Sequence, residues 1–394
     1  MSLPIADQSL PPQAAQSFAL FALGFRPFYL LAALFAALAI PLWELVLFGI
    51  VTLPMPGVLW HAHEMIFGFA TAVIVGFLFT AARTWTGLPT PTGRALAVLA
   101  ALWLGGRIGM VLSAGAIAAV VDSLFLPAAT VALAMVFIKA GNRRNYFIIG
   151  LLAVLALANA AAHLARLGLL ALDPLQPLWF SLGLITVLET VIGGRVISMF
   201  TASALRGVKQ WQHRGLNQTA IFCTGMALLL WVLDIRIIGA PLALLAAALQ
   251  FARCIGWNPW ATRRTPLLWI LHLAHLWIPI ALVLLALVQW GLLPRSAAVH
   301  ALAIGATGGL IIGMITRTAL GHTGRILVAG NIEATAYCLV QLAAAARVLS
   351  LVAFPSLVLY GIHLAAILWS LAFALYFVRY LPWLIYARPD GRTG

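Results

Sequence analysis

Apolar runs of near-membrane length recur along this chain from one end to the other, and they constrain its fold more than any other feature. A run of about 20 residues is long enough to cross the hydrocarbon core of a bilayer as a helix. Of the 394 residues, 64% are hydrophobic and only 8% are charged, and the mean hydropathy is +1.06. The sequence therefore predicts an all-α, polytopic helical membrane protein.

We expect about twelve transmembrane helices in one bundle. The expected spans are 28–50, 61–83, 94–113, 116–139, 145–170, 177–203, 217–238, 239–257, 266–290, 296–319, 326–350 and 354–380. Residues 1–27 form a polar N-terminal tail without the apolar core of a signal peptide, and 381–394 form a C-terminal tail. No connection is long enough to fold by itself, so 28–380 is interpreted as a single transmembrane domain.

The distribution of charge orients the bundle and excludes nucleic acid as a partner. The net charge is +14, but the basic residues stand singly at the ends of apolar runs, as membrane anchors do. Lys and Arg concentrate in the even-numbered connections and in both tails, which predicts that both termini are cytoplasmic. The three cysteines, Cys223, Cys254 and Cys338, lie in separate apolar runs without CxxC spacing, so neither a disulfide framework nor a zinc cluster is indicated.

The segment Trp60–Met65 places two histidines and a glutamate at the outer lip of an apolar run. Such groups are costly to bury in hydrocarbon, and neutral imidazole is a common ligand of copper, iron and zinc. His61 and Glu64 share a helical face, whereas His61 and His63 point roughly 200° apart on a regular helix. One metal would bind both histidines only if the first turn were unwound. Otherwise they serve two sites, or one binds the metal and the other supports it.

The other polar residues inside the expected spans divide by depth into two groups. The outer group is His61, His63, Arg107, Asp122, His163, His300 and His363. The inner group is Arg195, His272, His275, Arg317, His322 and Arg325. A single histidine in an apolar span is often a hydrogen-bonded structural residue, and Arg107 and Arg195 could be helix-packing residues. A buried guanidinium nevertheless usually needs an anionic partner.

Several segments resemble signature sequences of the NnrS family. They are Trp60–Phe69, Ile192–Ile197 and Thr316–Arg325, with Gly24–Phe28 and Thr265–His272 fitting as well. The resemblance covers nearly the whole chain. It implies a twelve-span protein of the bacterial inner (cytoplasmic) membrane that carries heme and copper, accompanies denitrification genes and protects cells from nitrosative stress.

The resemblance also carries over individual positions. Six histidines match recurring histidines of the family: His61, His63, His163, His272, His300 and His322. His275 stands where tyrosine is more frequent, and His363 matches no family motif. The stretch 197–203 lacks the Phe-Thr-Arg-Asn ending that is frequent in the family, so a role for that arginine cannot be carried over.

Two arrangements of the expected cofactors follow. In the outer arrangement, His61, His63 and His300 bind copper, and His163 is the axial ligand of heme b. Asn159 then orients or contacts the His163 site, and Arg107 meets the heme propionates. In the inner arrangement, the axial ligand is His272 or His322, and the propionates meet Arg195, Arg317 or Arg325. We prefer the outer arrangement because more histidines converge there.

Three classes of function remain open from the sequence. The first is a redox enzyme acting on nitric oxide or a related nitrogen species, with Glu64 or Glu189 delivering protons and an unidentified electron donor. The second is a non-catalytic heme or copper protein that binds nitric oxide. The third is a transporter of copper, heme or a small solute. A heme-copper oxidase is excluded because the adjacent His-His pair and the His-Pro-Glu motif are missing.

Overall fold

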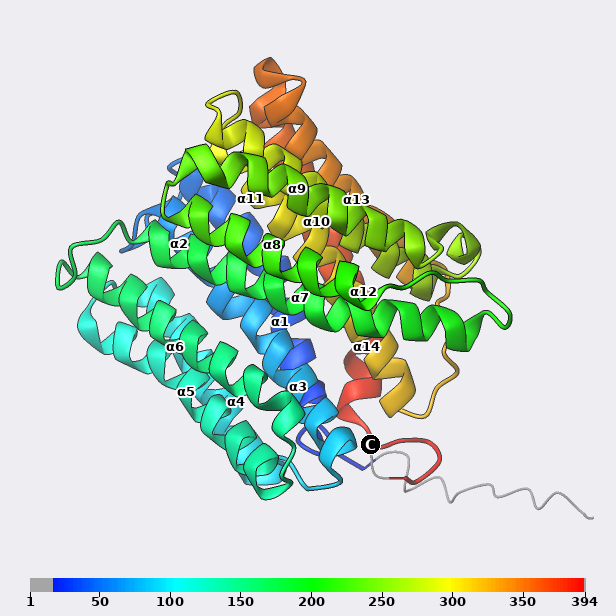
Figure 1. Ribbon diagram of the computed structural model, residues 1–394. Helices are drawn as coiled ribbons and strands as arrows, with labels where there is room; N and C mark the ends of the chain where they lie inside the picture. The colour runs from blue at the N-terminus through cyan, green and yellow to red at the C-terminus, as the bar shows by residue number, and fades with distance from the viewer. Residues whose placement is uncertain (1–16, 393–394) are drawn as a thin grey trace, which may run out of the picture.

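The computed structural model describes residues 17–392, and it contains twelve helical spans long and apolar enough to cross a membrane (Figure 1). The predicted all-α fold and number of spans are confirmed. The spans are Phe25–Leu47 (α1), Gly57–Thr86 (α2 Gly57–His63, η2 Glu64–Ala70 and α3 Thr71–Thr86), Gly93–Leu112 (α4), Ala116–Lys139 (α5), Arg143–Arg166 (η3 Arg143–Asn145 and α6 Tyr146–Arg166), Leu175–Ala204 (α7), Arg214–Val232 (α8), Arg236–Gly256 (α9), Pro266–Gln289 (α10), Arg295–His322 (α11 Arg295–His300, η5 Ala301–Gly308 and α12 Gly309–His322), Asn331–Val352 (α13) and Pro355–Ile385 (η6 Pro355–Leu357 and α14 Val358–Ile385).

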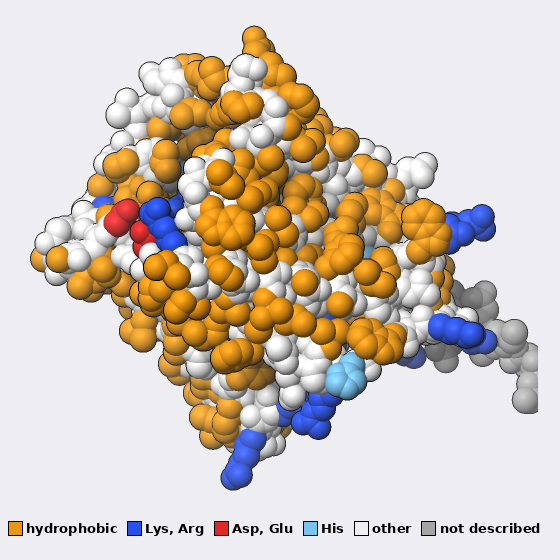
Figure 2. Space-filling model, turned by 45° about the horizontal axis from the view of Figure 1, so that its top comes forward, with side chains coloured by type: hydrophobic (Ala, Val, Ile, Leu, Met, Phe, Trp, Pro, Cys, Tyr) orange, Lys and Arg blue, Asp and Glu red, His pale blue; other side chains and the backbone are white. Residues whose placement is uncertain are grey.

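The helices form one body in which α1 and α3 lie between two groups (Figure 1). The group α4, α5 and α6 lies on one side. It packs on the central helices chiefly where its helix α5 contacts α3. The larger group contains α7 to α14, with α8 beside α9, α9 beside α10, and α13 beside α14. On the face shown in Figure 2, apolar side chains cover the middle and basic side chains lie toward the edges, as a surface in contact with lipid requires.

The two ends of the described chain meet on one side of the bundle. Phe18 forms an isolated antiparallel bridge with Tyr386. Arg26 is fully buried and donates to the carbonyls of Leu384 and Tyr386 at 2.9 and 2.8 Å, which satisfies the last turn of α14. The helices of the described chain run from Phe25 to Ile385, and residues 1–16 of the predicted N-terminal tail lie outside the described residues. The cytoplasmic orientation of this side remains a prediction from charge.

Two spans are interrupted by π-helices, and each interruption directly follows a histidine of the expected copper site. Segment η2 begins after His63, and η5 begins after His300. The indole nitrogen of Trp103 donates to the carbonyl of Gly68 in η2 at 2.9 Å, so a backbone group within the π-turn is satisfied. In η5, Gly305 lies directly against the ring of Trp277, where a larger side chain would collide. Such π-segments occur frequently at functional sites.

Candidate functional site

His61 and His63 contact different parts of the molecule. The Nδ1 atom of His63 lies 2.8 Å from a carboxylate oxygen of Glu64, and its Nε2 atom lies 3.0 Å from the amide oxygen of Asn159. The ring of His61 instead lies 6.3 Å from the ring of His300, between centroids. Helix α2 is regular at this point, so the two histidines serve two sites, as one of the alternatives from their spacing predicted. The structure thus does not bring the three expected copper ligands together.

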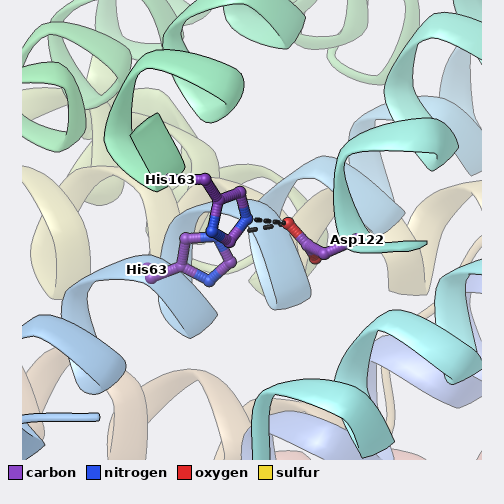
Figure 3. Close-up of side chains that lie close together, drawn as sticks. All are labelled: His63, Asp122 and His163. Atoms are coloured by element: carbon purple, nitrogen blue, oxygen red, sulfur yellow. Dashed lines mark hydrogen bonds and ion pairs between the residues drawn. The ribbon is translucent and has the colours of Figure 1, made fainter. Parts of the chain in front are cut away.

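The first of these sites is a buried cluster of polar side chains, partly drawn in Figure 3. Its members are His63, Glu64, Arg107, Asp122, Asn159 and His163, which come from α2, η2, α4, α5 and α6 and are all at most 5% exposed. Asp122 lies at its centre and accepts hydrogen bonds from His163 Nε2 and from the amide nitrogen of Asn159, each at 2.8 Å. The guanidinium of Arg107 pairs with both carboxylates of the cluster, including Glu64 at 2.9 Å.

The position of the proton on His163 follows from its two neighbours. Its Nδ1 atom lies 3.4 Å from a guanidinium nitrogen of Arg166, which can only donate. This arrangement suits the tautomer in which Nδ1 accepts and the proton on Nε2 is donated to Asp122.

The protonation of His63 follows in the same way. The amide nitrogen of Asn159 donates to Asp122, so its oxygen faces His63. Both ring nitrogens of His63 consequently face oxygen acceptors, an arrangement that suits an imidazolium with two N–H donors. The carboxylates of Glu64 and Asp122 thus lie against the imidazole of His63 and the guanidinium of Arg107. Nearly all polar atoms of the buried cluster have a partner, and Nε of Arg107 is the exception among them.

The buried cluster also has the composition of a metal site. His63, Asp122 and His163 offer three ligand atoms within 4.8 Å of one another, a combination that suits iron or zinc. A metal ion would have to displace the protons that these atoms now share, and the His163 proton would have to move to Nδ1, which faces Arg166. The arrangement is better explained as a network that joins α4, α5 and α6 to the second span.

The second site is an apolar cavity of about 270 Å³, which we call the His61 cavity. Its walls come from α1, α2, η2, α7, α11, η5, α13 and α14, so both π-helices border it. The polar or charged side chains on its wall are His61, Arg295, Ser296, His300, Thr307 and Arg347. Among the described residues that line it, none is Asp or Glu. The cavity is therefore apolar with a positive polar edge.

Within the His61 cavity, the rings of His61 and His300 are close enough for one metal ion to reach a nitrogen of each. Their planes differ by 18°, and their centroids are 6.3 Å apart. Two metal–nitrogen bonds of about 2.0–2.1 Å, extended by a ring radius at each end, span roughly 6 Å. The Nδ1 atom of His300 donates to the carbonyl of Ser296 at 2.8 Å, which leaves Nε2 with a free lone pair. The ring of His61 makes no hydrogen bond to any described residue, and its Nδ1 is buried.

A smaller apolar cavity of about 100 Å³ adjoins the His61 cavity through Ile185, which borders both. Among the described residues on its wall, Glu189 is the only charged one, and one of its carboxylate oxygens is buried without a hydrogen bond to any of them. Glu189 also lies next to Thr307, which lines the His61 cavity. Of the two glutamates predicted to deliver protons, Glu189 is thus close to the His61 cavity, whereas Glu64 is engaged in the buried cluster.

The inner group predicted from the sequence is dispersed in the structure. His272 shares a hydrogen bond of 2.9 Å with Thr201, and the ring of His322 lies 5.6 Å from that of Phe25. Arg317 stacks on the ring of Phe200, and Arg325 stacks on the ring of Trp383. Arg195 is exposed. None of these five inner residues lines either apolar cavity.

The remaining features of the sequence have structural partners. Gly193 allows close approach of the buried His275 ring, and Gly194 allows close approach of Arg253, which explains the glycine pair in the segment Ile192–Ile197. His363 accepts or donates a hydrogen bond of 2.8 Å with Glu44 near the protein surface.

Sequence reasoning missed the two arginines of the His61 cavity. Arg347 lies in α13, is 9% exposed and donates to the hydroxyl of Ser296 at 3.1 Å. Arg295 begins α11 and stacks on the ring of Trp179, 3.9 Å from its centroid. The available signal was a single arginine inside the apolar run 334–353, because an ionisable residue at membrane depth is a candidate functional residue.

Comparison with known proteins agrees with this architecture. The family model described as NnrS protein matches residues 19–388, nearly the whole chain. No curated protein matches the sequence. The matched region includes every residue of the buried cluster and of the His61 cavity. The chain belongs to the NnrS family.

Proposed function

We propose that this membrane protein holds a redox-active metal centre, heme b or copper, between His61 and His300 and binds nitric oxide there in defence against nitrosative stress. The observation that carries the proposal is the pair of imidazoles, 6.3 Å apart between ring centroids, on the wall of a largely apolar cavity. Because His63 belongs to the buried cluster, the proposed centre has two imidazole ligands instead of three. Membership of the NnrS family supports the link to nitric oxide.

The two histidines have different roles in this proposal. His300 is the fixed ligand, because the carbonyl of Ser296 holds its Nδ1 proton and so sets the tautomer and the ring orientation. His61 is the exchangeable ligand, because its ring makes no hydrogen bond to any described residue and lies against the ring of Trp43, 4.4 Å away between centroids. A bound heme iron or copper supplies an electron and a coordination position for nitric oxide.

The walls of the His61 cavity suit a small neutral molecule. Apolar side chains such as Phe69 and Trp369 exclude water while admitting a diatomic gas. If nitric oxide is reduced, protons are needed, and Glu189 beside Thr307 is the carboxyl group placed to deliver them. The apolar setting and the single carboxyl group therefore support both nitric oxide binding and reduction.

The test uses the full-length protein purified in detergent. We expect a metal-dependent visible spectrum that shifts on exposure of the reduced protein to nitric oxide, with iron or copper near one per chain. His300→Ala should lose the metal, and His363→Ala, a histidine outside the cavity, should retain it. Equal metal contents in both variants would contradict the proposal. Consumption of nitric oxide with an electron donor then separates an enzyme from a binding protein.

A further inference from the structure

Arg347 is a buried cation that faces the His61 cavity without an acidic partner. It is 9% exposed, and one of its terminal nitrogens, Nη1, is buried and makes no hydrogen bond to any described residue. The other, Nη2, donates only to the neutral hydroxyl of Ser296 at 3.1 Å. Arg295 adds a second positive charge on the same wall. This contrasts with Arg107, whose guanidinium is paired with two carboxylates.

A guanidinium remains charged even in an apolar site, and its planar donors match an anion with two oxygens. Burial of such a charge without a counterion is unfavourable. An anion bound next to this guanidinium would remove that free-energy cost. We propose that Arg347, assisted by Arg295, is the anion-recognition site of the His61 cavity and binds a carboxylate or another small oxyanion. This inference rests on the proposed function, because it concerns the ligand of the same cavity.

Two sources could supply such an anion. One is a carboxylate of a porphyrin bound between the histidines, and the other is a free oxyanion such as nitrite. In both cases Arg347 is linked to His300, because Ser296 accepts from Arg347 and its hydroxyl lies 3.0 Å from His300 Nδ1. An anion bound to Arg347 therefore changes the hydrogen bonding and electrostatic environment of His300. This change gives a spectroscopic readout that is independent of activity.

The first arm of the test compares hemin with hemin dimethyl ester, which lacks the free carboxylates. Full-length protein from heme-deficient cells is titrated with each compound, and the Soret band is followed. If the porphyrin supplies the anion, the wild type should bind hemin about tenfold more tightly than the ester, as expected for one charge-assisted pair. Arg347→Met should remove this preference, and Arg347→Lys should retain part of it. Arg317→Met, an arginine outside the cavity, should leave it unchanged.

The second arm titrates the same proteins with nitrite by calorimetry, without porphyrin. Saturable binding to the wild type that is lost in Arg347→Met would identify a free oxyanion as the ligand. If Arg347→Met behaves as the wild type in both arms while remaining folded, as judged by gel filtration and thermal unfolding, the inference is overturned. Failure of the wild type to bind either porphyrin would contradict a heme centre in the proposed function, and the nitrite arm would still decide the role of Arg347.

Discussion

His63 of the buried cluster and His61 of the His61 cavity are two residues apart on one helix, and the two sites differ in the partners of their histidines and arginines. In the cluster, both nitrogens of His63 have oxygen partners, and the carboxylates are balanced by cations. In the cavity, Nδ1 of His61 and a guanidinium nitrogen of Arg347 are buried without a partner. A buried polar atom without a partner calls for an explanation, and a ligand in the cavity would give Nδ1 of His61 and the guanidinium of Arg347 their partners.

The comparison also shows that close spacing of ligand-type atoms is not sufficient to identify a metal site. The atoms of His63, Asp122 and His163 lie within 4.8 Å of one another, yet they hydrogen-bond to each other and to their neighbours. Nδ1 of His61 and Nε2 of His300, in contrast, make no hydrogen bond to any described residue. Hydrogen-bond partners, more than distances, distinguish the two sites.

The largest expected effect is on stability, and it should come from the buried cluster. Asp122→Ala leaves Arg107 and His163 without their common acceptor, so we expect it to destabilise the protein by about 3–5 kcal/mol. Thermal unfolding in detergent measures this loss. Asp234→Asn, which removes an exposed charge and tolerates the left-handed backbone at this position, should change stability by less than about 0.5 kcal/mol. An Asp122→Ala protein with normal stability but no bound metal would reverse the assignment of the two sites.

The next effect concerns metal content and separates the histidines of the two sites. His300→Ala should lower metal affinity by at least about tenfold. Loss of a direct metal ligand should cost at least as much affinity as loss of a residue that hydrogen-bonds to a ligand. His61→Ala should keep part of the metal but change its spectrum. His163→Ala should instead lower stability while the folded protein keeps its metal, as measured by elemental analysis after gel filtration. Metal loss in His163→Ala alone would favour the heme position expected from the sequence.

A smaller effect on stability tests the π-helix η2 that lies between the two sites. Trp103→Phe removes the donor to the carbonyl of Gly68, so we expect a loss of about 1–3 kcal/mol. Trp85→Phe, at a half-exposed position without such a hydrogen bond, serves as the control. Equal unfolding temperatures for the two variants would show that this carbonyl does not need its partner.

The smallest effect should come from the link between Arg347 and His300. Ser296→Ala removes the hydroxyl but keeps the backbone carbonyl that holds His300. We therefore expect less than a tenfold loss of metal affinity, together with a small shift of the metal-dependent absorption band, in line with one neutral hydrogen bond. A complete loss of metal would show that the hydroxyl, and not the carbonyl, positions His300.

Much of the fold could be predicted from the sequence, because helix length and apolar composition are local properties. The twelve spans agree with those expected, and the opposite directions of His61 and His63 follow from helical periodicity. The partnership of Asn159 with the His163 site was also anticipated, although the structure places Asp122 between the two side chains.

The division of the outer histidines into two sites could not be predicted. It depends on which faces of α5, α6 and α13 turn toward the second span, and that is set by tertiary packing. The π-helices η2 and η5 were not anticipated either, since no local sequence pattern marks them, and the close packing at Gly68 and Gly305 within them is a tertiary feature. Arg347 was overlooked because a lone arginine in an apolar run gives no indication of what it faces.

The central claim is that His61 and His300, and not His63 and His163, hold the metal centre. The most direct measurement is the visible spectrum of the purified protein, reduced and then exposed to nitric oxide, with iron and copper determined on the same samples. We predict that the nitric oxide-sensitive band and the metal disappear together in His300→Ala and persist in folded His163→Ala. Persistence in His300→Ala and disappearance in His163→Ala would contradict the account.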